Sequence, residues 1–220
     1  MIDRTSPMTR SVPFILGLTG SIGMGKTTAA QNFRAAGVPV FDADQAVAEL
    51  YEGDAVALIE GAFPGTIKAG KVDRDALAEA VLGDRAAMRR LEEIVHPLVR
   101  SLERAFLDNA GRSGARLAVL DIPLLFETGG EGRCDAVAVV SAPAHMQRER
   151  VLARAGMNEQ RFDAILARQM PDEEKRRRAH FLIDTSREHM AGARQVSAII
   201  RALAGRPTHQ QAPLRDQAHA

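Results

Sequence analysis

Residues 20–27 of the chain read GSIGMGKT, which fits the pattern G-x-x-x-x-G-K-[ST]. The apolar run VPFILGLT at 12–19 precedes this segment, and residues 26–36 have the pattern of a helix that ends before Gly37. Glycines let successive backbone N–H groups turn toward an anion, and the start of a helix adds its positive dipole end. The segment therefore predicts a strand, a phosphate-binding loop and a helix in succession, with a chance glycine-rich turn as the alternative.

The loop also contains side chains suited to binding a nucleoside triphosphate. We expect Lys26 to reach the β and γ phosphates, and the Thr27 hydroxyl to ligate Mg2+. The nucleotide-binding residues that the motif predicts are Gly20, Gly23, Met24, Gly25, Lys26 and Thr27.

Short apolar runs recur along the chain with helical patterns between them. The runs lie at 12–19, 38–41, 117–121, 136–140 and 181–184. The helical patterns between and after them lie at 26–36, 144–155, 159–169, 172–179 and 188–203. Five buried strands separated by helices predict an α/β fold with a doubly wound parallel five-stranded sheet.

The section from about 45 to 110 has a different pattern. It contains helical patterns at 45–61, 73–82 and 84–109, and no run that predicts a strand. Pro97 falls within the third pattern, where a proline is expected to kink or break the helix locally. We expect a helical insertion here. The tail at 205–220 has few apolar residues and is expected to be disordered.

Three aspartates follow predicted strands, where open α/β sheets place their ligand crevice. Asp42 and Asp44 follow the second strand and share a face by alternation. One of them could cap the next helix while the other orients or deprotonates an acceptor hydroxyl. Asp121 ends the third apolar run, LAVLD at 117–121, and is either an aspartate that contacts magnesium through water or a strand-terminal turn residue.

Arginines are concentrated between the last two predicted strands, from Arg148 to Arg178. Mobile arginines there could close over a nucleotide and neutralise charge on the transferred phosphoryl group. We expect two or three of them to be functional and the others to lie on solvated helix faces. The six histidines show no metal-ligand spacing, and on helix pattern alone His96 is a structural residue.

Composition excludes several other classes of protein. The 220 residues include 29 basic and 28 acidic residues, a net charge of +1, so we expect no nucleic acid partner that is bound through a bulk positive field. No apolar run approaches the roughly 20 residues that span a bilayer, so we expect no membrane partner. Cys134 is the single cysteine, which excludes an internal disulfide and favours a cytoplasmic location. We expect a monomer or weak homo-oligomer.

Taken together, the motifs resemble the dephospho-CoA kinase family. They occur in that family's order and spacing and cover about residues 14 to 204. The matching stretches are LTGSIGMGKTT (18–28), GVPVFDAD (37–44), HPLV (96–99), DIPLLFE (121–127), QRERVLAR (147–154), QMPDEEKRRRA (169–179) and FLID (181–184). The loop alone indicates only a nucleotide-binding protein, whereas the whole set is much more specific.

The resemblance implies a P-loop NTPase-type kinase core at 12–44 and 115–204, with a helical lid at about 145–179 and an acceptor-binding insertion at 45–114. It implies transfer of the ATP γ-phosphoryl group to the ribose 3′-hydroxyl of dephospho-CoA, the last step of coenzyme A synthesis. It assigns the catalytic base to Asp44 and extends the ATP loop to Thr28. The other residues that it implies are Arg150 and Arg154 on the lid, and Asp42, His96 and Glu127 on the acceptor side.

Two alternative functions stay open at this point. One is another small-molecule or nucleoside kinase of the P-loop class, which shares the ATP chemistry but has a different acceptor. The other is a nucleotide-binding switch protein. A guanine-specific switch would need an [NT]-K-x-D motif, and none of the four lysines lies in one.

Overall fold

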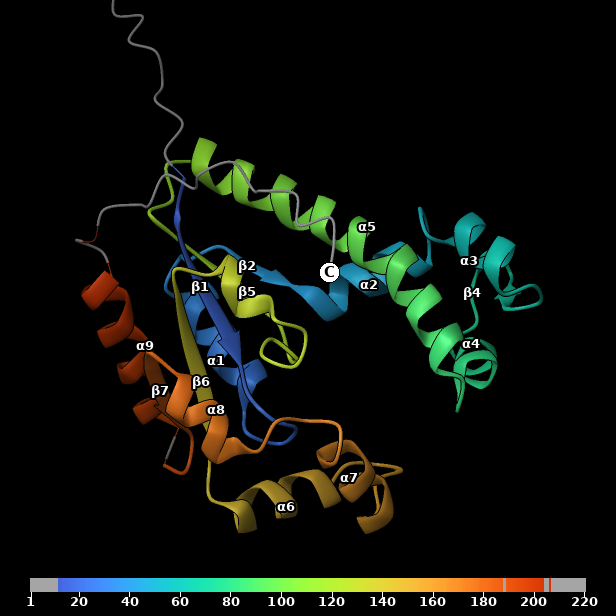
Figure 1. Ribbon diagram of the computed structural model, residues 1–220. Helices are drawn as coiled ribbons and strands as arrows, with labels where there is room; N and C mark the ends of the chain where they lie inside the picture. Colours follow the sequence, from blue (N-terminus) through green and yellow to red (C-terminus); the bar gives the residue numbers. More distant parts are fainter. Residues whose placement is uncertain (1–11, 188, 204–205, 207–220) are drawn as a thin grey trace, which may run out of the picture. The chain divides into compact units, whose positions relative to one another are not determined.

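The computed structural model describes residues 12–187, 189–203 and 206, and these form two compact units (Figure 1). The first unit contains the described residues up to Phe41 and from Leu107 onward, and the second runs from Asp42 to Phe106. The expectation of a disordered tail at 205–220 lies outside the described residues, apart from residue 206.

The first unit is built on a five-stranded sheet. Its strands are β1 (Phe14–Thr19), β2 (Val40–Asp42), β5 (Leu117–Asp121), β6 (Ala136–Ser141) and β7 (Phe181–Asp184), in the order β2-β5-β1-β6-β7. β1 pairs in parallel with both β5 and β6, and β6 pairs in parallel with β7. All five predicted strands are thereby confirmed. Because β1 is central and buried on both faces, its sequence is almost continuously apolar.

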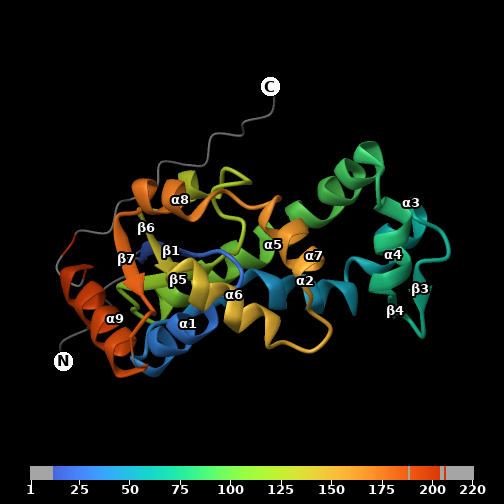
Figure 2. The same ribbon diagram turned by 90° about the horizontal axis from the view of Figure 1, so that it is seen from below.

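Helices cover both faces of this sheet (Figure 2). Helices α1 (Lys26–Ala35) and α9 (His189–Leu203) lie on one face, and α8 (Asp172–Arg178) lies on the other. Successive side chains of β6 point to opposite faces of the sheet, so they pack in two different clusters of buried residues. Ala138 and Val140 pack with Phe33 of α1, whereas their neighbour Val139 packs with Leu125 on the opposite side. The doubly wound α/β fold is confirmed.

Two further helices, α6 (Ala144–Leu152) and α7 (Glu159–Leu166), come between β6 and α8, and a short 3₁₀ helix spans Gly130–Arg133. The side chain of Asn158 caps α7 by accepting a hydrogen bond from the backbone N–H of Arg161 at 2.9 Å. The three helical segments expected between residues 144 and 179 are therefore all present.

The second unit differs from expectation in two places. The helix expected at 45–61 is two helices, α2 (Ala43–Tyr51) and α3 (Val56–Ala62), with a turn at 52–55. The section expected to lack strands contains an antiparallel hairpin of β3 (Ile67–Lys68) and β4 (Lys71–Val72). Its two turn residues, Ala69 and Gly70, both have positive φ, as two-residue hairpins with a type I′ turn require.

Helix α4 (Arg74–Val81) leads to the long helix α5 (Arg85–Arg112), most of which belongs to the second unit. The helix is continuous through Pro97, so the expected break is absent. Pro97 has no N–H to donate to the carbonyl of Glu93. The helix continues nonetheless because residues on both sides of Pro97, Leu91 and Leu102 among them, pack in the core of this unit. No helix in the described ranges has the length and apolarity that crossing a bilayer requires.

Candidate active site

The segment between β1 and α1 is a tight turn that depends on its glycines. Gly23 and Gly25 have φ values of 78° and 89°, which side-chain-bearing residues rarely adopt. A Cβ at Gly23 would lie 2.5 Å from Cγ2 of Val151 on α6, and one at Gly20 would lie 2.7 Å from the carbonyl oxygen of Val140. A side chain at either position would collide with these neighbours, so the close packing of the loop requires glycine there. The segment has the strand–turn–helix geometry that its motif predicted.

Lys26, at the start of α1, forms an ion pair with Asp121 at the end of β5. Lys26 Nζ lies 2.5 Å from Asp121 Oδ1, and the Asp121 side chain is only 3% exposed. The register of β1 and β5 sets Leu18 opposite Asp121, so the carboxylate is fixed beside the loop. A buried carboxylate therefore faces the lysine that is expected to bind phosphate. This placement agrees with an aspartate at the nucleotide site and leaves contact with magnesium as a prediction.

A cavity of about 380 Å³ lies beside the loop. It brings together three regions of the first unit that are distant in sequence: the loop with α1, the end of α6, and the segment after β7. The residues that line it are Gly23, Gly25, Thr28, Ala29, Asn32, Arg150, Arg154, Ile183, Thr185, Arg187 and Gly192. Of the predicted site residues, the cavity thus unites two loop glycines and Thr28 with both lid arginines.

The two lid arginines have different environments in this cavity. The Arg150 guanidinium donates hydrogen bonds to the hydroxyl and carbonyl oxygens of Thr185, at 3.1 and 2.7 Å. The Thr185 hydroxyl donates in turn to the carbonyl of Met24, at 2.7 Å. Arg154 is exposed, and its guanidinium has no hydrogen bond or ion pair within the described part of the chain. Arg150 is therefore anchored to the loop through Thr185, whereas Arg154 lacks such an anchor in the described structure. Contact of either arginine with a ligand stays a prediction.

Sequence analysis missed several residues that the structure brings to the loop. Thr185 and Arg187, which follow β7, line the cavity. Gln147 and Gln169 form hydrogen bonds with the backbone of Ile22. Both glutamines lie in stretches that matched the dephospho-CoA kinase family, and this match was the signal that could have identified them.

Glu127, predicted for the acceptor side, is engaged within the protein. Its Oε1 accepts a hydrogen bond from the backbone N–H of Met170 at 2.8 Å and lies 2.8 Å from Nζ of Lys175, whose side chain is fully buried. Burial raises the pKa of the Glu127 carboxyl, but the interactions with Lys175 and Met170 outweigh it, so the pKa lies below its ordinary value. Its Oε2 is buried and has no hydrogen-bond partner in the described structure. Contact with the acceptor stays a prediction.

The sequence predicted that one of Asp42 and Asp44 could cap the next helix, and the structure assigns this cap to Asp42. Asp42 is the N-cap of α2, and its Oδ1 accepts a hydrogen bond from the backbone N–H of Gln45 at 3.0 Å. Asp44 lies in the first turn of α2 with an exposed side chain. The helix start is therefore satisfied by Asp42, and the carboxylate of Asp44 is accessible for chemistry.

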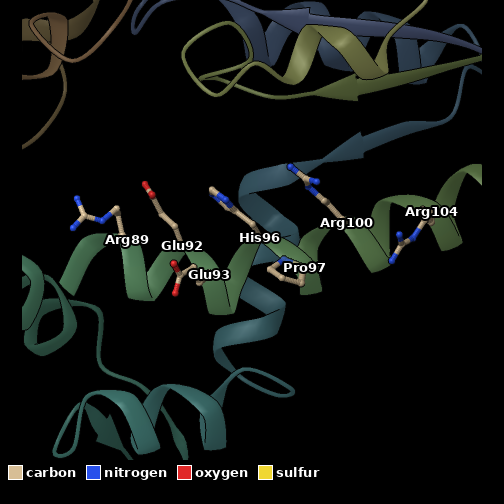
Figure 3. A pocket seen from close by; sticks show the side chains of 7 residues that line it. All are labelled: Arg89, Glu92, Glu93, His96, Pro97, Arg100 and Arg104. Carbon is tan, nitrogen blue, oxygen red and sulfur yellow. The ribbon is translucent and has the colours of Figure 1, made fainter. Parts of the chain in front are cut away.

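A second hollow, of about 530 Å³, lies along α5 in the second unit (Figure 3). Its lining side chains recur at helical spacing and carry mixed charge: Arg89, Glu92, Glu93, His96, Pro97, Arg100 and Arg104. Figure 3 shows His96 and Arg100 pointing to the same side of the helix. His96 is exposed and lies outside the core of this unit, and its part in binding an acceptor stays a prediction. No group of three His, Cys, Asp or Glu side chains in the described ranges could hold a metal ion.

The fold and the loop by themselves define a class of protein. A parallel sheet whose central strand leads through GSIGMGKT into a helix, beside a cavity lined by arginines, is the arrangement of a P-loop nucleotide-binding protein. A family model described as dephospho-CoA kinase matches residues 14–190. The chain belongs to the dephospho-CoA kinase family.

One relative supports the family assignment by its sequence, and two solved structures are similar in fold. The chain is 58% identical over 193 residues to a dephospho-CoA kinase of Rhodopseudomonas palustris (strain HaA2), covering 88% of this chain and 97% of that protein. A crystal structure from Thermus thermophilus has a TM-score of 0.77 and 38% identity, and the match covers 88% of this chain and 99% of that one. A dephospho-CoA kinase from Campylobacter jejuni shares the fold with a TM-score of 0.60 at 23% identity, covering 88% and 98% of the two chains. The family resemblance noted in the sequence is confirmed.

Proposed function

We propose that the protein transfers the γ-phosphoryl group of ATP to the ribose 3′-hydroxyl of dephospho-CoA, which completes coenzyme A. The observation that carries this proposal is the membership of residues 14–190 in the dephospho-CoA kinase family. The first unit supports it with a phosphate-type loop beside a cavity that three arginines line, Arg150, Arg154 and Arg187. A cytoplasmic location, supported by the single cysteine, is part of the same proposal.

The residues of the loop bind and orient ATP. Backbone N–H groups of residues 23–28, at the positive end of α1, hold the phosphates, and Lys26 exchanges its contact with Asp121 for the β and γ phosphates. Arg154, exposed in the cavity, neutralises charge that spreads over the transferred group. Arg150 supports the loop from the side through Thr185.

The oxygen atoms present near the loop suit magnesium. Mg2+ prefers oxygen ligands, and the exposed hydroxyl of Thr27 and the carboxylate of Asp121 are of that kind. We assign Mg2+ to Thr27, with Asp121 as a further oxygen donor. When bound, the ion would neutralise phosphate charge.

The second unit is assigned to the acceptor. The exposed carboxylate of Asp44 orients the 3′-hydroxyl and takes its proton. The hollow along α5 offers His96 and three arginines, a set suited to the phosphate groups of dephospho-CoA. Asp42 supports this side by fixing the start of α2, and Glu127 is retained as a further acceptor-side residue.

The test is an ADP-release assay with ATP, Mg2+ and dephospho-CoA, run beside adenosine, AMP and a control without acceptor. We expect turnover that depends on dephospho-CoA, with coenzyme A identified by its mass. If turnover occurred with adenosine or AMP but not with dephospho-CoA, the protein would still be a kinase, but the proposed substrate would be wrong. Hydrolysis of ATP without any acceptor would favour a nucleotide-binding switch.

A further inference from the structure

Both backbone polar groups of one loop residue are held by side chains from outside the loop. The N–H of Ile22 donates to Gln169 Oε1 at 3.0 Å, and Gln147 Nε2 donates to the carbonyl of Ile22 at 2.8 Å. A backbone N–H can only donate and a carbonyl can only accept, so the orientation of each glutamine amide is fixed by its partner. The two glutamines therefore clamp a single peptide residue from two directions.

Such a clamp matters because the loop is rich in glycine. The segment 20–25 contains Gly20, Gly23 and Gly25, and glycine loses more conformational entropy on ordering than any other residue. Phosphate binding requires the backbone N–H groups of the loop to converge, and groups that are held in place before binding reduce this entropic cost. Ile22 lies between Gly20 and Gly23, so hydrogen bonds to its backbone from Gln147 and Gln169 restrict the conformational freedom of the turn.

The helix that provides Gln147 is in direct contact with the loop. Gln147 is itself only 5% exposed. A Cβ at Gly23 would lie 2.9 Å from the carbonyl oxygen of Gln147 and 2.5 Å from Val151, so α6 packs against the loop backbone at that point. The amide of Gln147 therefore reaches Ile22 from a helix that packs directly against the loop.

Gln169 is anchored through its neighbour in sequence. The N–H of Met170 donates to Glu127 at 2.8 Å, and Glu127 is paired with the fully buried ammonium group of Lys175 at 2.8 Å. The acceptor for the Ile22 N–H is thus tied to an ion pair that joins Lys175 of α8 to Glu127. Because these groups have low exposure, the anchor is firmly placed.

We propose that Gln147 and Gln169 are positioning residues that hold the loop at Ile22 in the conformation that receives the phosphates of ATP. The inference deepens the proposed function and rests on it for the identity of the nucleotide. Neither glutamine is assigned contact with a reacting atom. Both act on ATP affinity through the loop backbone.

The first test removes each hydrogen bond with little change in side-chain volume. Gln147→Met and Gln169→Met are titrated with a non-hydrolysable ATP analogue and compared with Gln160→Met, a change at an exposed position of α7. We expect each clamp variant to weaken analogue binding roughly 5- to 30-fold, and the Gln160 variant to have no effect. The KM for dephospho-CoA should change by less than about two-fold. Variants that lose thermal stability but bind the analogue normally would overturn the inference.

The second test uses the opposite directions of the two hydrogen bonds. Gln169→Glu keeps an acceptor for the Ile22 N–H, whereas Gln147→Glu replaces a donor with an acceptor that faces a carbonyl. Both changes add the same charge near the same residue, so their electrostatic effect on ATP is matched. We expect Gln169→Glu to rescue binding relative to Gln169→Met, and Gln147→Glu to bind at least as weakly as Gln147→Met. Equal losses in the two Glu variants would contradict the clamp.

These tests separate the inference from the proposed function. Analogue binding is measured without any acceptor, so it responds to the clamp even if dephospho-CoA is not the substrate. Conversely, wild-type turnover with dephospho-CoA together with unchanged analogue binding in both Met variants would leave the proposed function standing and refute the clamp.

Discussion

The proposed phosphoryl transfer depends most directly on Asp44, whose carboxylate is the proposed base for the 3′-hydroxyl. Asp44→Asn keeps the size of the side chain and removes its ability to take a proton. We expect kcat to fall by roughly 10²- to 10⁴-fold, the usual contribution of a general base. Affinity for an ATP analogue should stay within about two-fold, because the carboxylate acts on the acceptor.

The control for this variant is Asp54→Asn, an exposed aspartate in the turn after α2. It removes the same charge from the same unit without touching α2 or its cap. If Asp54→Asn lost as much turnover as Asp44→Asn, the effect would be one of net charge, and Asp44 would not be the base.

Substitution of the two lid arginines should have different effects, on kcat for Arg154 and on thermal stability and ATP binding for Arg150. Arg154 is exposed and its guanidinium is free of described partners, so Arg154→Ala is expected to lower kcat about 10- to 100-fold with little change in thermal stability. Arg150 donates two hydrogen bonds to Thr185, so Arg150→Ala should lower the melting temperature and weaken ATP binding together. Steady-state kinetics and thermal melts on both variants check this division. The opposite pattern would exchange the roles of the two arginines.

At the scale of elements, the ion pair of Glu127 and Lys175 joins α8 to the segment after β5. Lys175→Met would leave a buried carboxylate without its cation, which we expect to cost about 3 kcal/mol of unfolding free energy at pH 7. The pKa of Glu127 is lowered in the folded protein, so the unfolded chain binds the proton more tightly. The stabilising contribution is therefore complete above the ordinary pKa of 4.5 and is lost as the pH falls through the lower, native pKa.

Urea unfolding of the wild type and Lys175→Met at pH 7 and below pH 4.5 measures this contribution. We expect the difference in unfolding free energy to shrink as the pH falls. Lys71→Met is the matched control, because the ion pair of Lys71 with Glu52 is more than half exposed on both sides and should contribute about 0–1 kcal/mol. A difference that stayed constant with pH would mean that Lys175 acts through packing and not through its charge.

Elements were predictable from sequence where one local pattern dominates. β1 and β6 are buried on both faces, so their sequences are continuous apolar runs. The hairpin of β3 and β4 was missed because each strand has two residues, too few to show alternation, and its turn is Ala69-Gly70 where Asn-Gly would be the usual signal. At Pro97 a kink or a break was expected, and the break is absent because tertiary packing preserves a helix that a proline would locally oppose.

The candidate site was predictable to the extent that its residues form local motifs. The loop from Gly20 to Thr28 is one continuous segment with a recognisable motif, and the positive φ angles of its turn fall on glycines, Gly23 and Gly25. The contacts of Ile22 with Gln147 and Gln169 join residues 125 and 147 positions apart, and no local pattern encodes such a distance. The same holds for Thr185, which reaches Met24 only because β7 and β1 are brought into one sheet.

At the scale of the whole molecule, each unit has a hydrophobic core of its own. Ile59, fully buried, belongs to the core of the second unit, and Leu16, also fully buried, belongs to the core of the first. Truncating either side chain to alanine should cost about 2–5 kcal/mol of stability. Because the cores are separate, we expect the damage to be largely confined to the unit that contains the substitution.

This separation predicts that the two substrates can be affected independently. Ile59→Ala should speed backbone hydrogen exchange in peptides from residues 42–106 and raise the KM for dephospho-CoA, while the ATP analogue still binds with nearly wild-type affinity. Leu16→Ala, two strand positions before Leu18 in β1, should speed exchange in the sheet and weaken analogue binding. If either variant accelerated hydrogen exchange equally in both units, the two units would unfold as one. The two substrates could then not be affected independently, and this prediction would be wrong.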